Sequence, residues 1–174
     1  MEIERKFLLN KIPENLESYT KFDLEQAYIS TEPVIRVRKK GTASNTRYIL
    51  TVKSTGLMSR QEFELDIDEH SYNNLLKKSE GNIISKSRYV IPLDTSLTLE
   101  LDIFHGKFEG LVMGEIEFPD EETAKKYTSP EYLSEEVTFD TRFHNSTMSN
   151  MSDTDRLDLI SWIQKNNCLC NKMH

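Results

Sequence analysis

The sequence has no long apolar run and almost no cysteine, and each absence excludes a class of protein. No segment approaches the roughly 18 consecutive apolar residues that a membrane-spanning helix needs. Charged residues at positions 2, 4, 5 and 6 leave no apolar stretch for a signal peptide, so we expect a cytoplasmic protein without a membrane partner. Cys168 and Cys170 lie too close together to cross-link much of a fold.

Positive charge is also in the minority. The 174 residues include 22 Lys and Arg against 29 Asp and Glu, a net charge of −7, which argues against an extended nucleic-acid partner. Only 37% of the residues are hydrophobic whereas 29% are charged, so the chain either exposes much polar surface or keeps polar groups inside. Its length predicts one domain, residues 1–174, with a sizeable core.

Strand-like segments are abundant and follow one another within residues 1–146. Most alternate at period two and are rich in Val, Ile, Phe and Tyr, which predicts a mainly β, antiparallel (α+β) domain. The segments are "EIERKFLL", "FDLEQAYIS", "VIRVRKK", "RYILTVKS", "RQEFELDID", "ISKSRYVIPL", "LTLELDIF", "LVMGEIEFP" and "EVTFDTRF". Flanking helices are expected at "EHSYNNLLKK", at "DEETAKKY" and at about 152–166, where the last helix is amphipathic.

The charged residues of these segments share one face of each strand. In the opening segment Glu2, Glu4 and Lys6 stand at every second position, so their side chains project together. The same parity holds in the later segments, which present Arg36 with Arg38, Thr51 with Lys53, Glu62 with Glu64 and Asp66, Lys86 with Arg88, Glu100 with Asp102, Glu115 with Glu117, and Asp140 with Arg142.

Two arrangements could explain this parity. One is a sheet with a solvated charged face over an apolar core. However, neighbours on each face carry like charges, which repel one another and would weaken an open sheet. A closed barrel instead lets acidic pairs face basic pairs across a charged lumen. Carboxylates bind hard divalent cations and Arg or Lys bind phosphate, so the two together predict a metal-bound polyphosphate.

The segment "EIERK" resembles the ExExK motif that opens the CYTH-domain proteins, the triphosphate tunnel metalloenzymes. The resemblance continues in chain order through "IRVRKK", "LTVKS", "RQEFEL", "ISKSRYVI", "LELDIFHG", "GLVMGEIEFP" and "EEVTFDTRFHN". It implies a CYTH-like domain: a closed antiparallel barrel of about eight strands, open as a tunnel with a charged lumen. It also implies a metal-dependent triphosphatase, with a small-molecule triphosphate as substrate.

The resemblance also implies roles for individual residues. Glu2 and Glu4 would bind Mg²⁺ or Mn²⁺ together with Glu115 and Glu117, while Asp102, Glu62 and Glu64 would complete the acidic wall or brace the basic one. The residues that would hold the triphosphate are Lys6, Arg36, Arg38, Lys53, Arg88 and Arg142. Lys86 is similar to the family lysine that pairs with the ExExK lysine near the attacked phosphorus.

The sequence departs from the family pattern at "FDTRF", where the family segment reads like Gly-Asp-Lys-Arg-Tyr. Asp140 and Arg142 are kept, but Thr141 replaces a lysine and Phe139 a glycine. By parity Thr141 points away from the lumen, so we expect a modest effect.

Phosphoryl transfer needs charge neutralisation and an in-line nucleophile, here expected to be water. Two lysines close together lower the pKa of one of them, which makes Lys86 with Lys6 a candidate base. A metal-bound hydroxide is an alternative base, and each lysine could instead only bind phosphate.

Inorganic tripolyphosphatase is the function we expect. Class IV adenylyl cyclase and thiamine, nucleoside or RNA triphosphatase are alternatives within the family. A thiamine substrate would favour an aromatic platform, but the only tryptophan, Trp162, lies on the last helix, and the negative net charge disfavours RNA. From other classes, a non-catalytic polyphosphate-binding module would tolerate loss of metal ligands, and an apolar-ligand barrel would reverse the parity. A homodimer is compatible with the sequence.

Overall fold

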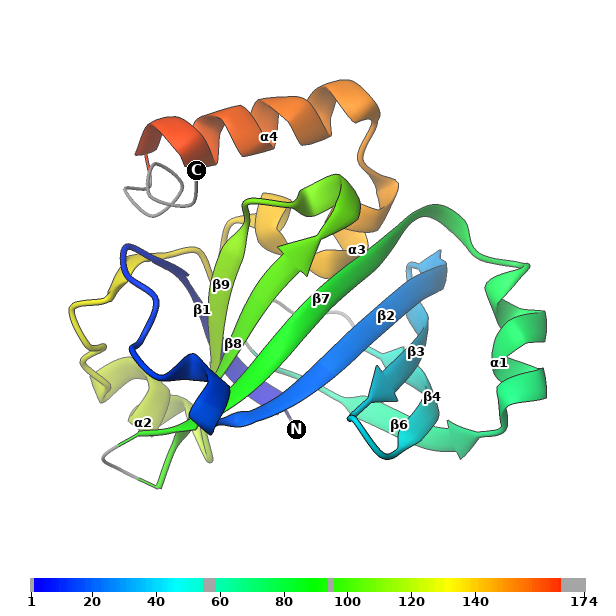
Figure 1. Ribbon diagram of the computed structural model, residues 1–174, viewed down its shortest axis with the longest axis horizontal. Helices are drawn as coiled ribbons and strands as arrows, with labels where there is room; N and C mark the ends of the chain where they lie inside the picture. The colour runs from blue at the N-terminus through cyan, green and yellow to red at the C-terminus, as the bar shows by residue number, and fades with distance from the viewer. Residues whose placement is uncertain (1, 55–58, 94–95, 167–174) are drawn as a thin grey trace.

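The computed structural model describes residues 2–54, 59–93 and 96–166, so Cys168 and Cys170 lie outside the described residues. The chain folds into a curved antiparallel sheet with helices at its margins (Figure 1). The strands are β1 (Glu2–Leu9), β2 (Thr20–Thr31), β3 (Val34–Gly41), β4 (Thr46–Lys53), β5 (Ser59–Arg60), β6 (Glu62–Ile67), β7 (Glu80–Pro92), β8 (Thr98–His105), β9 (Val112–Glu117) and β10 (Leu133–Glu136). Nine of them form one continuous path in the order β10-β1-β9-β8-β7-β2-β3-β4-β6.

The predicted closed barrel of about eight strands is wrong in both closure and strand count. The path ends at β10 and β6, and within the described residues these two strands share no ladder. The free edge of β1 is divided instead between two short partners. Phe7, Leu8 and Leu9 pair with β10, whereas Glu2 and Ile3 pair with the two-residue β5. Alternation in a sequence shows which face a residue occupies, but not how far each ladder extends, so closure was not predictable from it.

The helices are α1 (Glu69–Leu76), α2 (Glu121–Lys126), α3 (Asn145–Asn150) and α4 (Asp153–Asn166), with short 3-10 helices η1 (Leu16–Ser18), η2 (Gly106–Phe108) and η3 (Thr141–Phe143). Figure 1 shows α4 across one end of β8 and β9, and α1 beside β3 and β4. None of the helices in the described part of the chain is long and apolar enough to cross a membrane.

The segment "EVTFDTRF" does not form the strand that its alternation predicted. Pairing ends with β10 at Glu136, and the chain turns into η3 at Thr141. The Asp140 carboxylate accepts a hydrogen bond from the backbone N–H of Arg142 at 3.0 Å. Such a local side-chain cap competes with strand pairing.

Gly81 allows α3 to pack against β7. It has a φ of 79°, and a Cβ at this position would lie only 2.1 Å from the backbone oxygen of Ser149. Next to it, the buried amide of Asn82 donates to the backbone oxygens of Met148 at 3.2 Å and Met151 at 2.9 Å. These contacts attach the end of α3, and the short segment that connects α3 to α4, to the sheet.

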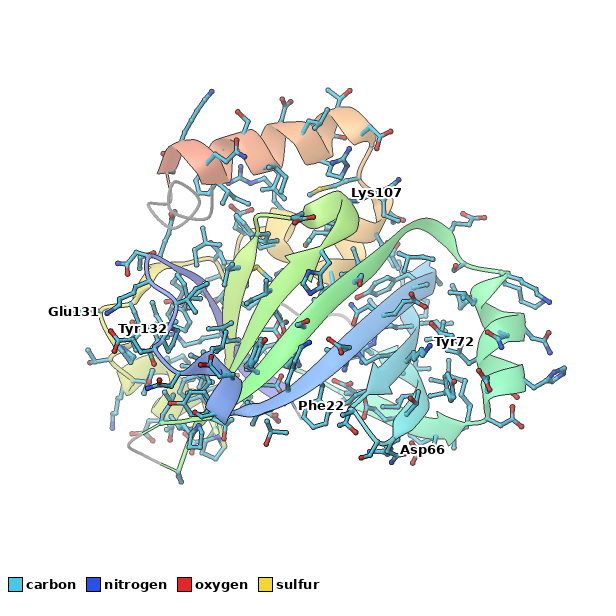
Figure 2. All side chains as sticks on the ribbon, viewed as in Figure 1. Phe22, Asp66, Tyr72, Lys107, Glu131 and Tyr132 are labelled. Atoms are coloured by element: carbon cyan, nitrogen blue, oxygen red, sulfur yellow. The ribbon has the colours of Figure 1, made fainter. Side chains whose placement is uncertain are left out.

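Apolar side chains form three clusters. Two lie on the convex side of the sheet, one beside α2 around Leu99 and Leu101, and one under α1 around Tyr72 (Figure 2). The Tyr72 ring centroid lies 5.0 Å from that of Tyr48. The third cluster joins strand residues that share parity with the charged positions to η3, α3 and α4; its members include Leu8, Ile84, Phe104, Met113, Phe143, Met148 and Ile163. The charged face is therefore bounded at one end by an apolar floor.

Candidate active site

The concave face of the sheet lines a cavity of about 820 Å³. Strands β1, β3, β4, β6, β7, β8 and β9 contribute to its walls because their charged faces turn inward, and β2 contributes Tyr28. Its charged lining residues are Glu4, Lys6, Arg36, Arg38, Lys40, Lys53, Glu62, Glu64, Arg88, Glu100, Glu115 and Glu117. The parity predicted from separate segments thus brings most of the predicted site residues into one cavity.

The acidic wall lies on β1, β9 and β8. Glu4 is opposite Glu117 in the β1–β9 ladder, and Lys6 is opposite Glu115. The Lys6 Nζ lies 2.9 Å from Glu4 Oε1 and 2.7 Å from Glu115 Oε1. Burial alone would lower the pKa of Lys6, but Glu115 and Glu4 outweigh it and raise that pKa above its ordinary value. Lys6 therefore stays protonated in this arrangement.

Arg88 on β7 faces this wall and is fixed by carboxylates. Its Nε and Nη2 donate to the two oxygens of Asp102, each at 2.6 Å, and Nη2 also donates to Glu115 Oε2 at 2.8 Å. Glu100 contacts Nη1. Asp102 is fully buried and does not line the cavity. It therefore braces the basic residues behind the cavity surface.

Lys86 is buried behind the cavity rather than exposed to it. Its ammonium pairs with Asp102 and lies 5.1 Å from the ring centroid of Phe104, in the apolar floor. Burial lowers the pKa of Lys86 to about 8; Asp102 opposes this shift, while Arg88 and Arg38 add to it. The main cause is thus burial, not the repulsion by Lys6 that the sequence suggested.

A second group of pairs lies on β3, β4 and β6. The Arg36 Nη2 donates to Thr51 Oγ1 at 2.9 Å and lies 3.4 Å from Glu64 and 3.6 Å from Glu62. The Lys53 Nζ lies 2.5 Å from Glu62 Oε2. The Arg36 Nε is buried and has no hydrogen-bond partner within the described residues. Glu62 and Glu64 therefore brace the basic wall, one of the two roles expected for them.

Some cavity residues were missed by sequence reasoning. Lys40 shares the parity of Arg36 and Arg38, and that signal could have found it; its ammonium lies 4.1 Å from the ring centroid of Phe22, which is labelled in Figure 2. Glu100 was placed on the charged face with Asp102, but no role in the site was predicted for it. Tyr28 lies on the same face but carries no charge to mark it. Residues 144–146 also line the cavity, but they lie outside any strand, so alternation could not identify them.

Among the predicted residues whose side chains the structure describes, Arg142 joins Asp102 and Lys86 in not lining the cavity. Arg142 on η3 is exposed and pairs with Asp140 at 2.6 Å, and its guanidinium lies 4.7 Å from the ring centroid of Trp162. The cap by Asp140 turns this segment away from the sheet, which is why the structure does not bring Arg142 to the other cations. For Glu2, the backbone pairs with β5, but the side chain lies outside the described residues.

Comparison with known proteins decides the family. No family model matches the chain. The chain is 36% identical over 151 residues to an inorganic triphosphatase of Nitrosomonas europaea, covering 85% of this chain and 96% of that protein. It is 37% identical over 152 residues to an inorganic triphosphatase of Acetivibrio thermocellus, covering 84% and 92%. The chain belongs to the triphosphate tunnel metalloenzymes.

The fold agrees with this membership. The crystal structure of the inorganic triphosphatase NE1496 matches with a TM-score of 0.65 at 33% identity, covering 87% of this chain and 96% of that one. The family resemblance inferred from "EIERK" and the later segments is therefore confirmed. As a tunnel metalloenzyme, the chain has its charged cavity on the inner face of the curved sheet.

The carboxylates of this tunnel metalloenzyme are the type of ligand that a hard divalent cation prefers. Glu4, Glu115 and Glu117 offer only oxygen donors from two paired strands, as Mg²⁺ and Mn²⁺ prefer. No group of three or more His, Cys, Asp or Glu is preassembled for a metal in the described ranges. Lys6 pairs with Glu4 and with Glu115. A bound cation would compete with Lys6 for these oxygens.

Proposed function

We propose that this chain hydrolyses inorganic tripolyphosphate in the cavity, as a metal-dependent phosphoanhydride hydrolase. The observation that carries the proposal is the meeting of five cations, Lys6, Arg36, Arg38, Lys53 and Arg88, with the carboxylates of β1 and β9 in one cavity. A chain of linked phosphates is the small anion that needs several such cations at once. Relatives that share a third of the sequence are inorganic triphosphatases.

Arg36, Arg88 and Lys53 would hold phosphate oxygens by exchanging their carboxylate partners for substrate. Clustered cations without counter-charges repel one another strongly in a partly buried site. The pairs with Glu62, Glu64 and Asp102 offset that repulsion and fix the guanidinium groups before substrate arrives. Fixed charges of this kind stabilise a transition state better than mobile ones.

Glu4, Glu115 and Glu117, with Glu2, are the residues that would hold Mg²⁺ or Mn²⁺. The tunnel metalloenzymes depend on metal in general, and the choice between these two ions belongs to the proposal. When bound, such an ion neutralises phosphate charge and polarises the phosphoryl group.

The reaction joins the oxygen of a water molecule to a terminal phosphorus and breaks the bridging P–O bond, which releases phosphate and pyrophosphate. We assign phosphate binding to Lys6, since its neighbours keep it charged. We assign proton acceptance to Lys86, since a pKa of about 8 leaves part of it neutral under mildly alkaline conditions. Catalysis would then require Asp102 to release Lys86 toward the substrate.

A phosphate-release assay tests the proposal, with tripolyphosphate, ATP, thiamine triphosphate and pyrophosphate, each with Mg²⁺ and with Mn²⁺. We expect tripolyphosphate to have the highest kcat/KM. Faster release from ATP would favour a nucleoside triphosphatase, and no release with either ion would favour a binding module. The cytoplasmic location, the absence of nucleic-acid and membrane partners, and a homodimer stay predictions.

A further inference from the structure

Arg38 differs from four other cations that line the cavity. Lys6, Arg36, Lys53 and Arg88 each have a carboxylate oxygen within 3.4 Å. Within the described residues Arg38 has no carboxylate partner, and its Nε donates instead to the amide oxygen of Gln26 at 3.1 Å. Burial, together with the nearby Arg36 and Arg88, lowers the pKa of Arg38 to about 10, still far above neutrality. Its positive charge is therefore kept but not cancelled.

Gln26 is fixed at both ends of its amide. It is fully buried and lies directly opposite Arg38 in the β2–β3 ladder. Its Oε1 accepts from Arg38, and its Nε2 donates to the Tyr28 hydroxyl at 3.1 Å. Because a guanidinium can only donate, the amide orientation is determined by Arg38. Tyr28, also buried, lines the cavity beside Arg38.

A neutral acceptor has a different effect on an arginine from that of a carboxylate. The hydrogen bond from Nε restricts rotation of the guanidinium plane, yet leaves Nη1 and Nη2 for a bidentate contact with phosphate. A carboxylate in the same place would also orient the plane, but a phosphate would then have to compete with it. Burial of an amide is unfavourable unless its groups are bonded, and here Arg38 and Tyr28 bond both.

We infer that Gln26 is a positioning residue that holds Arg38 ready to receive a phosphate without neutralising its charge. This inference rests on the proposed function, because it assigns Arg38 to the binding of the same substrate. The four paired cations must exchange a carboxylate for substrate, whereas Arg38 need not. Among these five cations, Arg38 is therefore the one at which a phosphate binds with the least rearrangement.

Calorimetry with tripolyphosphate, without divalent metal, measures this effect directly. Gln26→Glu keeps the size of the side chain and the hydrogen bond, but adds a charge beside Arg38, and we expect Kd to rise by about tenfold or more. Gln26→Met removes the hydrogen bond without adding charge, and a rise of about threefold is expected. The matched control is Gln164→Glu, the same charge change on the exposed side of α4, which should leave Kd at the wild-type value.

A double-mutant cycle separates positioning from a purely structural role. If Gln26 acts through Arg38, Gln26→Met should raise Kd in the wild type but not in an Arg38→Met background. An equal rise in both backgrounds, or a wild-type Kd for Gln26→Glu, would overturn the inference. Since Kd is read without turnover, a wild type that binds tripolyphosphate but does not hydrolyse it would overturn only the proposed function.

Discussion

Lys6 and Lys86 project from the same face of the sheet into opposite environments. Carboxylates from β1 and β9 keep Lys6 charged, whereas burial over Phe104 lowers the pKa of Lys86 to about 8. The sequence placed both lysines on the correct face of the sheet, because successive side chains of a strand point to opposite faces. It could not show which of these two buried lysines lies against the apolar floor, since the floor depends on how α3 and α4 fill one end of the curved sheet.

The pH dependence of hydrolysis follows from Lys86. Below pH 8 its folded-state pKa of about 8 keeps it protonated and unable to accept a proton, so kcat/KM for tripolyphosphate should rise as pH increases from 7 to 9. Lys86→Arg keeps the cation beside Asp102 but stays charged throughout this range. We expect this variant to lose at least about tenfold in kcat and to lose the alkaline rise.

The measurement is a pH profile of kcat and of kcat/KM for both enzymes. If Lys86→Arg retains the wild-type rate and the same profile, the proton is taken by another group and Lys86 only maintains the charge beside Arg88.

At the scale of elements, the positions where the chain turns away from the sheet determine what enters the cavity. Strand faces were predictable from local alternation, and the inward parity of β1, β3, β7 and β9 is what the segments suggested. The turn at η3 was not predictable from alternation. The Asp140 side chain caps this three-residue helix, and the cap outweighs the strand-like pattern of "EVTFDTRF". Residues 144–146 reach the cavity only because that turn brings α3 under the sheet.

Arg142 tests this account of η3. Since it contacts Asp140 and Trp162 rather than the cavity, Arg142→Ala should leave KM for tripolyphosphate within about twofold of wild type. Loss of the exposed ion pair and the ring contact should lower the free energy of unfolding by about 1 kcal/mol. Arg36→Ala is the matched comparison and should raise KM by at least about tenfold. Similar KM increases in both variants would place Arg142 at the substrate.

Gly81 tests the packing of α3. Gly81→Ala introduces a Cβ that would lie 2.1 Å from the Ser149 oxygen, at a φ of +79°, so α3 must shift. We expect a loss of roughly 2 kcal/mol or more in the free energy of unfolding. Gly106→Ala is the control, because its φ is also positive, at 62°, but a Cβ there would have no atom within 4 Å.

Urea denaturation of the two variants makes the comparison. Gly106→Ala should show backbone strain alone, about 1 kcal/mol. Equal losses in the two variants would mean that contact with α3 adds nothing at Gly81.

On the scale of the whole molecule, a chain with a net charge of −7 places the buried Lys and Arg of its described residues in one cavity or, for Lys86, directly behind it. Its acidic excess keeps the outer surface unfavourable for extended polyanions, while the cavity suits a short one. The charged inner face was predictable, but closure was not, because the edge of β1 is shared by β5 and β10. A sheet that is strongly curved, though not closed, still gathers the charges of seven strands.

The most direct test of the central claim is a ³¹P NMR time course of tripolyphosphate with Mg²⁺, run on the wild type and on Glu4→Gln. The wild type should convert the substrate to pyrophosphate and phosphate in equal amounts. Glu4→Gln removes a carboxylate from the acidic wall and should slow this conversion by about a hundredfold or more. Glu131→Gln, at an exposed position (labelled in Figure 2) that is not part of the cavity lining, should match the wild type. Conversion by Glu4→Gln at the wild-type rate would contradict the account.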